Sequence, residues 1–215
     1  MNLVLLSDFD GTITNLDTAL FLLDKFVEGD WRIFDLQYRE GKITLEECIQ
    51  ELYSMFDVPK HLMLKELEKT VSFRSNFNKL IDYCRIQNIP FIIVSAGLDF
   101  VINHFLKQKG LADSIKVHSI KTTITENGIK LAFPNLFDKD STNFKDDLVR
   151  YYKKKGSHVI YIGDGTSDYQ AINNADYRFS IKNSRLAELC RKNKISHQEI
   201  DDFQEVINAL KILIR

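Results

Sequence analysis

Three short apolar runs, each followed by small or acidic residues, constrain the fold of this chain most strongly. Leu3–Ser7 is followed by Asp-Phe-Asp-Gly-Thr, Phe91–Val94 by Ser-Ala-Gly, and His158–Ile162 by Gly-Asp-Gly. Continuous apolar runs of this length are typical of strands that are buried on both faces. Helical patterns lie between them, and this alternation predicts a three-layer, Rossmann-like α/β/α fold around a parallel sheet.

Further segments extend this pattern. Tyr177–Ile181 predicts a fourth strand, and Ile115–His118 predicts a weaker fifth one. Between the strands, apolar residues recur at the three- and four-residue spacing of amphipathic helices. One such set is Phe77, Leu80, Ile81 and Cys84.

Two segments interrupt the alternation. Residues 17–70 contain helical patterns and no convincing strand, and Thr44 with Glu47 predicts a capping box at the start of one helix. Lys121–Phe133 contains Asn127-Gly128 between two strand-like runs, which predicts a β-hairpin. We therefore expect a core of residues 1–14 and 75–215, a helical cap of residues 15–74, and a hairpin excursion from the core.

Charge and composition narrow the possible partners. The chain has 29 Lys and Arg against 30 Asp and Glu, a formal net charge of −1, so it has no basic excess for nucleic acid or an anionic membrane. No run approaches the roughly 20 apolar residues of a membrane helix, and Leu3–Leu6 is too short for a signal peptide. The three cysteines lack metal or disulfide spacing and predict buried thiols. We expect a cytoplasmic monomer or homodimer without nucleic-acid or membrane partners.

Carboxylates follow two of the predicted strands. Asp8 and Asp10 come directly after the first, and Asp164 and Asp168 after the third. Open parallel sheets build their sites beyond the carboxyl ends of the strands, so these four side chains are expected to converge. Clustered carboxylates are costly without a cation, and oxygen ligands suit Mg²⁺. The sequence therefore predicts a magnesium site at this edge.

The second strand end predicts an anion site beside the carboxylates. Ser95, Ala96 and Gly97 offer a hydroxyl and backbone N–H groups at the start of a helix. Lys145 lies on the helix before the third strand and could neutralise a phosphate at the same edge.

Gly11 and Thr12 follow the first carboxylate pair. Gly11 would allow the backbone to approach a phosphate closely. Thr12 either contacts that phosphate or caps the turn. Both are therefore candidate phosphate-binding residues.

These residues, in this order, resemble the four motifs of the haloacid dehalogenase superfamily: Asp8-Phe9-Asp10-Gly11-Thr12, Ser95, Lys145, and Gly163-Asp164 with Asp168. A helical cap after the first motif is similar to the phosphoserine phosphatase-like branch. Within that branch, three segments look most like the group of the methionine-salvage hydroxy-keto-methylthiopentenyl phosphate phosphatase and the phosphocholine phosphatases. These segments are Asp8–Thr14, Ile89–Phe100 and Arg185–Phe203.

The resemblance implies Mg²⁺-dependent hydrolysis of a small phosphorylated metabolite through an aspartyl-phosphate. Asp8 would be the nucleophile and Asp10 the general acid and base. Ser95 and Lys145 would hold the phosphoryl oxygens. Mg²⁺ would be bound by the carboxylates of Asp8 and Asp164 and by the backbone carbonyl of Asp10. Asp168 would either belong to the metal shell or orient Lys145.

Two related activities and one inactive class are alternatives. A phosphotransferase or phosphomutase would pass the same aspartyl-phosphate to an alcohol, and a regulatory module would bind phosphate without turnover. Asp10 argues against the carbon–halogen hydrolases of the superfamily, which lack an Asp at this place.

Substrate choice is expected to lie in the cap. The charged candidates are Asp17, Arg32, Arg39 and Arg74. The cap aromatic residues are expected to form mostly core, with one or two facing the substrate: Phe21, Phe26, Trp31, Phe34, Tyr38, Tyr53 and Phe56.

Overall fold

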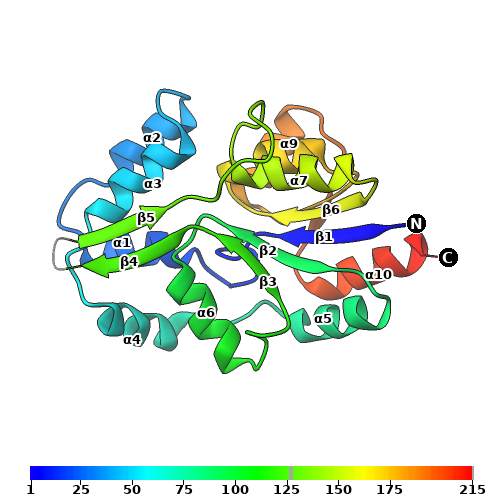
Figure 1. Cartoon of the computed structure of the whole chain (residues 1–215), viewed down its shortest axis with the longest axis horizontal. Coiled ribbons are helices and arrows are strands. Elements are labelled where there is room, and N and C mark those ends of the chain that lie inside the picture. The colour runs from blue at the N-terminus through cyan, green and yellow to red at the C-terminus, as the bar shows by residue number, and fades with distance from the viewer. Residues whose placement is uncertain (126–127, 215) are drawn as a thin grey trace.

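A six-stranded parallel sheet forms the centre of the molecule (Figure 1). The structure is a computed structural model that describes residues 1–125 and 128–214. The strand order is β3-β2-β1-β6-β7-β8, so the chain crosses over the sheet in both directions from the central β1. The strands are β1 (Leu3–Ser7), β2 (Phe91–Ser95), β3 (Lys116–Ser119), β6 (His158–Gly163), β7 (Tyr177–Ile181) and β8 (Gln198–Ile200).

Helices cover both faces of the sheet, which confirms the predicted α/β/α architecture (Figure 1). One face carries α5 (Phe77–Ile86), α6 (Asp99–Gln108) and α10 (Phe203–Leu213). The other carries α7 (Phe144–Lys154) and α9 (Arg185–Lys192), with α8 (Tyr169–Asn174) packed on α7. All residues of β1 and β2 are buried, as expected for strands between two helical layers.

Four helices lie within the segment expected to form the cap: α1 (Thr18–Phe26), α2 (Arg32–Arg39), α3 (Leu45–Ser54) and α4 (Lys60–Thr70). The predicted capping box is present at α3, where Glu47 N–H donates to Thr44 Oγ1 (3.1 Å) and Thr44 N–H donates to Glu47 Oε2 (2.7 Å). The sequence analysis did not predict α2, a helix of eight residues of which none is buried. It also missed β8, a three-residue edge strand with only one apolar residue.

The hairpin strands are confirmed, as β4 (Lys121–Thr125) and β5 (Gly128–Ala132) pair antiparallel. Asn127 of the predicted turn lies outside the described residues. The hairpin extends from the core toward the cap helices, and β5 contacts α3 (Figure 1).

The expectation of buried thiols is met. Cys48, Cys84 and Cys190 are buried, free thiols. Within the described ranges, none of the helices has the length and apolar character needed to span a bilayer.

Candidate active site

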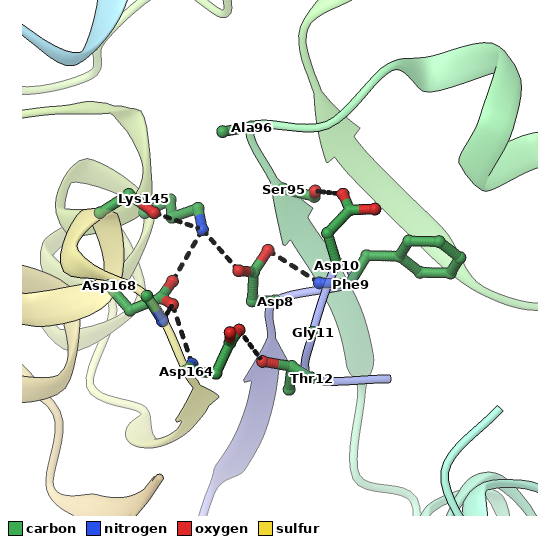
Figure 2. A network of polar contacts seen from close by, with 12 residues as sticks. Asp8, Phe9, Asp10, Gly11, Thr12, Ser95, Ala96, Lys145, Asp164 and Asp168 are labelled. Atoms are coloured by element: carbon green, nitrogen blue, oxygen red, sulfur yellow. Dashed lines mark hydrogen bonds and ion pairs between the residues drawn. The ribbon is translucent and has the colours of Figure 1, made fainter. Parts of the chain in front are cut away.

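Asp8 lies at the centre of the site because β1 is the central strand. β1 pairs with β2 on one side and with β6 on the other, and the Asp8 N–H donates to Ile162 O (2.9 Å) at the end of β6. One carboxylate oxygen of Asp8 accepts from the Phe9 N–H (2.7 Å). The other faces Lys145 (Figure 2). The strand ends thus bring together the residues that the sequence analysis grouped.

Lys145 is a buried cation between two carboxylates. Its ammonium lies 2.9 Å from Asp8 Oδ2 and 2.7 Å from Asp168 Oδ1, and it donates to Ser167 Oγ at 3.1 Å (Figure 2). Burial lowers the pKa of Lys145, but Asp168 and Asp8 outweigh it and raise that pKa above its ordinary value. Lys145 therefore stays charged beside the proposed nucleophile.

Asp168 is saturated by donors. Its Oδ1 accepts from Lys145 Nζ and from the Tyr161 hydroxyl (2.7 Å), and its Oδ2 accepts from the backbone N–H groups of Asp164 (3.1 Å) and Gly165 (2.9 Å). These contacts favour the orienting role over a direct metal ligand. The sequence analysis did not identify Tyr161 as a site residue, because a tyrosine inside a buried strand is expected to belong to the hydrophobic core.

Asp164 faces Asp8 across the site. Thr12 Oγ1 donates to Asp164 Oδ1 (2.7 Å), so this buried hydroxyl holds a carboxylate, a role outside the two alternatives considered from sequence. A Cβ on Gly11 would lie 2.4 Å from Asp164 Oδ2, and Gly11 has φ +72°, so only glycine fits here. Burial, with the Asp168 charge, raises the pKa of Asp164 to about 8.

The carboxylates fit a hard divalent cation. Among the described residues, Asp8, Asp164 and Asp168 present oxygens that all lie within 4.8 Å of one another. Burial and the neighbouring Asp168 also raise the pKa of Asp8, so these carboxylates are poorly compensated by Lys145 alone. Oxygen donors with excess negative charge are the set that Mg²⁺ prefers.

Asp10 points away from this carboxylate cluster. Its Oδ1 accepts a hydrogen bond from Thr18 Oγ1, and its Oδ2 accepts one from Ser95 Oγ (3.2 Å). Burial raises the pKa of Asp10, and the hydrogen bonds from Thr18 and Ser95 oppose that rise. A raised pKa favours a carboxyl group that can donate a proton near neutral pH. A Cβ on Gly97 would lie 2.0 Å from Asp10 Oδ2, so Gly97 makes room for this side chain.

Two of the four charged specificity candidates do not line the cavity. Arg74 donates to the backbone carbonyls of Gly11 and Thr12, both at 2.8 Å, and so braces the first motif from behind. Arg32 is exposed, pairs with Asp24 and lies over the Trp31 ring.

A cavity of about 260 Å³ lies between the strand ends and the cap helices. It contains both remaining candidates, Asp17 and Arg39. Asp17 also caps α1 by accepting from the Leu20 N–H (2.9 Å), and burial with the Asp10 charge raises its pKa to about 7. Arg39 pairs with Asp35 at 2.7 Å.

Two tyrosines and one arginine are among the lining residues that the sequence analysis did not name as site residues. Tyr38 and Tyr53 belong to the cap aromatic set, of which one or two members were expected to face the substrate. Arg185, at the start of α9, lines the cavity from the core side. Arg185 begins one of the three segments that carry the family resemblance, but only the fold places it at the same cavity as Asp8.

The fold and the site define a hydrolase of the haloacid dehalogenase type, with a Rossmann-like α/β/α core. The family model for haloacid dehalogenase-like hydrolases matches residues 5–173, and the chain belongs to this family. The family resemblance inferred from the motifs is therefore confirmed.

Relatives and solved structures agree with this assignment. A 2-hydroxy-3-keto-5-methylthiopentenyl-1-phosphate phosphatase of Brevibacillus brevis is 29% identical over 97% of this chain and 95% of its own length. The enzyme of the same name from Bacillus cereus strain B4264 is 26% identical over 100% of this chain and 98% of its own length. The chain is thus an enzyme of the phosphatase type.

Solved phosphoserine phosphatases share the fold. A phospho-aspartyl intermediate analogue of phosphoserine phosphatase has a TM-score of 0.73 at 17% identity, covering 97% of this chain and 98% of that one. A substrate-bound phosphoserine phosphatase complex has a TM-score of 0.71 at 16% identity, covering 97% of both chains.

Proposed function

We propose that this chain hydrolyses a small phosphomonoester in two steps, with Mg²⁺ as cofactor and Asp8 as the nucleophile. The observation that carries the proposal is the placement of the Asp8 carboxylate at the cavity edge, 2.9 Å from the buried Lys145 ammonium. Lys145 orients Asp8, and its ammonium can hold a phosphoryl oxygen by exchanging the bond to Ser167 Oγ, because Asp8 and Asp168 occupy its other two donors. Phosphoryl transfer depends mainly on such positioning and charge stabilisation.

In the first step, an Asp8 oxygen attacks phosphorus and the bond from phosphorus to the ester oxygen breaks. Asp10 donates its proton to the departing oxygen, which leaves as an alcohol. In the second step, water attacks phosphorus, Asp10 takes the proton of that water, and the bond to Asp8 breaks. Inorganic phosphate is released and both carboxyl groups return to their starting state.

Mg²⁺ would be held by the carboxylates of Asp8 and Asp164 and by the Asp10 backbone carbonyl. When bound, it supplies positive charge beside the transferring phosphoryl group. Asp168 acts on Lys145, because four donors already occupy its oxygens. Ser95, Ala96 and Gly97 line the same cavity, where the Ser95 hydroxyl donates to Asp10 and the Gly97 N–H donates to Ser95.

The cap side of the cavity favours a leaving group with an apolar end. Half of the residues that line it are aliphatic: Ala19, Leu20, Leu23, Leu45, Ile49 and Leu52. The relatives' named substrate, a methylthiopentenyl phosphate, ends in such a group. Phosphoserine carries an ammonium and a carboxylate instead, and here Arg39 is already paired with Asp35. We infer a substrate nearer to the former.

A panel of phosphomonoesters with apolar and with charged leaving groups tests this function. Phosphate release is measured with Mg²⁺ and with a chelator. We expect turnover only with Mg²⁺, the highest kcat/KM for esters with an apolar tail, and none for Asp8→Asn. Turnover by Asp8→Asn, or full activity in the chelator, would overturn the proposal. Added acceptor alcohols reveal a phosphotransferase if phosphorylated alcohol replaces phosphate as the product.

A further inference from the structure

Tyr53 connects α3, a helix of the cap segment, to the loop Ser95-Ala96-Gly97 that follows β2 in the core. Its hydroxyl, on α3, donates to the backbone carbonyl of Ala96 at 2.9 Å. Tyr53 is 3% exposed and Ala96 is half-buried, so the bond lies at the wall of the cavity and is only partly open to water. The contact ties the loop after β2 to α3.

The bonded carbonyl belongs to a peptide group whose other end is also held. Ala96 C=O and Gly97 N–H form one peptide unit, and Gly97 N–H donates to Ser95 Oγ (3.0 Å). Ser95 Oγ in turn donates to Asp10 Oδ2 (3.2 Å; Figure 2). Hydrogen bonds in such a chain polarise one another. The chain runs without a break from the Tyr53 hydroxyl to the Asp10 carboxyl group.

The second oxygen of Asp10 is also held by a cap helix. Thr18, the first residue of α1, donates to Asp10 Oδ1. Both oxygens of Asp10 are therefore fixed by cap helices, one directly and one through the loop. The loop and Asp10 fit closely, because a single Cβ on Gly97 would overlap Asp10 Oδ2. A shift of the loop must therefore move Asp10.

We propose that Tyr53 is a positioning residue for Asp10, acting through the Ala96–Gly97 peptide and Ser95. This inference rests on the proposed function, in which Asp10 protonates the leaving oxygen. Lys145 and Asp168 orient the nucleophile, whereas Tyr53 and Thr18 orient the proton donor. The cap then contributes to the chemistry as well as to substrate choice.

Tyr53→Phe tests this role, because it removes one hydroxyl and keeps the ring. A misplaced proton donor affects esters in proportion to their need for protonation. For kcat/KM, which covers the steps up to departure of the leaving group, we expect a loss of about tenfold or more with alkyl phosphates and of about twofold or less with p-nitrophenyl phosphate. Asp10→Asn should show the same ordering with a larger loss.

Two further variants complete the test. Tyr83→Phe, on α5 outside the cavity, should leave both activities unchanged. Thr18→Val, which keeps the side-chain shape, should show the same leaving-group dependence, because Thr18 holds the other oxygen of Asp10. Equal losses with alkyl and aryl esters in Tyr53→Phe would overturn the inference while leaving the proposed function intact. A wild-type enzyme inactive on every ester would overturn both.

Discussion

The Lys145 ammonium lies 2.9 Å from Asp8 Oδ2, and the two side chains are only 1% and 8% exposed. Asp168 holds the same ammonium from the other side at 2.7 Å. The lysine thus neutralises part of a carboxylate cluster that the interior could not otherwise accommodate. The charge around Asp8, the proposed nucleophile, therefore depends on Lys145.

Replacing Lys145 should therefore impair both stability and activity. Because Lys145→Met leaves buried carboxylates without their cation, we expect the free energy of unfolding to fall by about 3–5 kcal/mol when no divalent cation is added. Phosphatase activity should be lost. Chemical denaturation and phosphate release measure the two effects.

Lys154→Met is the matched control for this variant. Lys154 forms an exposed ion pair with Asp138 at 2.6 Å. Such surface pairs contribute about 1 kcal/mol or less. A loss for Lys145→Met no larger than that of Lys154→Met would contradict the buried-cation account.

The metal-free protein should become less stable as the pH rises from about 4 toward about 8. The folded-state pKa of Asp164 is raised from 3.8 to about 8, so within this window the folded protein binds the proton more tightly than the unfolded chain. Unfolding then releases a proton, and stability falls with increasing pH. Asp17, with its pKa raised to about 7, adds a slope of the same sign.

Thermal unfolding at several pH values, in chelator and in Mg²⁺, checks this dependence. Asp164→Asn should retain only the part that comes from the other carboxylates, and Mg²⁺ should flatten the dependence by favouring the ionised carboxylates. The same melting temperature in chelator at pH 5 and pH 8 would argue against the predicted charge balance.

Gly97→Ala should separate activity from stability. The new Cβ would meet Asp10 Oδ2, the far end of a side chain that can turn away, and so it displaces the proposed proton donor. We expect kcat/KM for alkyl phosphates to fall by about 100-fold, the lower end of a general acid's contribution, with little change in melting temperature.

Gly110→Ala provides the opposite case. Gly110 has φ +68° and open space around it, so alanine adds only backbone strain of about 1–2 kcal/mol. It should lower stability and leave kcat/KM unchanged. Normal activity in Gly97→Ala would show that Asp10 is not held as described.

Arg74 should affect the rate without affecting substrate preference. Its guanidinium holds two adjacent carbonyls, which an ammonium cannot match in geometry. Arg74→Lys should lower kcat and reduce stability by about 1–3 kcal/mol, while the ranking of substrates stays the same. Arg32→Ala, which breaks a surface pair, should change neither quantity measurably. A changed substrate ranking in Arg74→Lys would restore Arg74 as a specificity residue.

Strand ends were predictable because their signal is local. The buried runs before Asp8, Ser95 and Gly163 identify parallel strands, and the topology rule then brings their ends together. The cluster around Asp8 could therefore be predicted without coordinates.

Residues that act across the fold could not be found in this way. Tyr161 and Tyr53 look like ordinary core residues, and their hydroxyl groups gain meaning only from the partners Asp168 and Ala96. Arg74 was predicted as a candidate substrate contact, because the sequence shows the charge of a side chain but not where that side chain points. The helix α2 was not predicted because its eight residues span only about two turns and none of them is buried.

Phosphate attached to Asp8 is the most direct test of the central claim. Asp10→Asn with p-nitrophenyl phosphate should form the intermediate without a proton donor and hydrolyse it slowly, because no base activates the water. We predict a burst of about one nitrophenol per enzyme, and a phosphorylated Asp8 in peptides mapped by mass spectrometry after acid quench. A burst with Asp8 unmodified, or phosphate on another residue, would contradict the account.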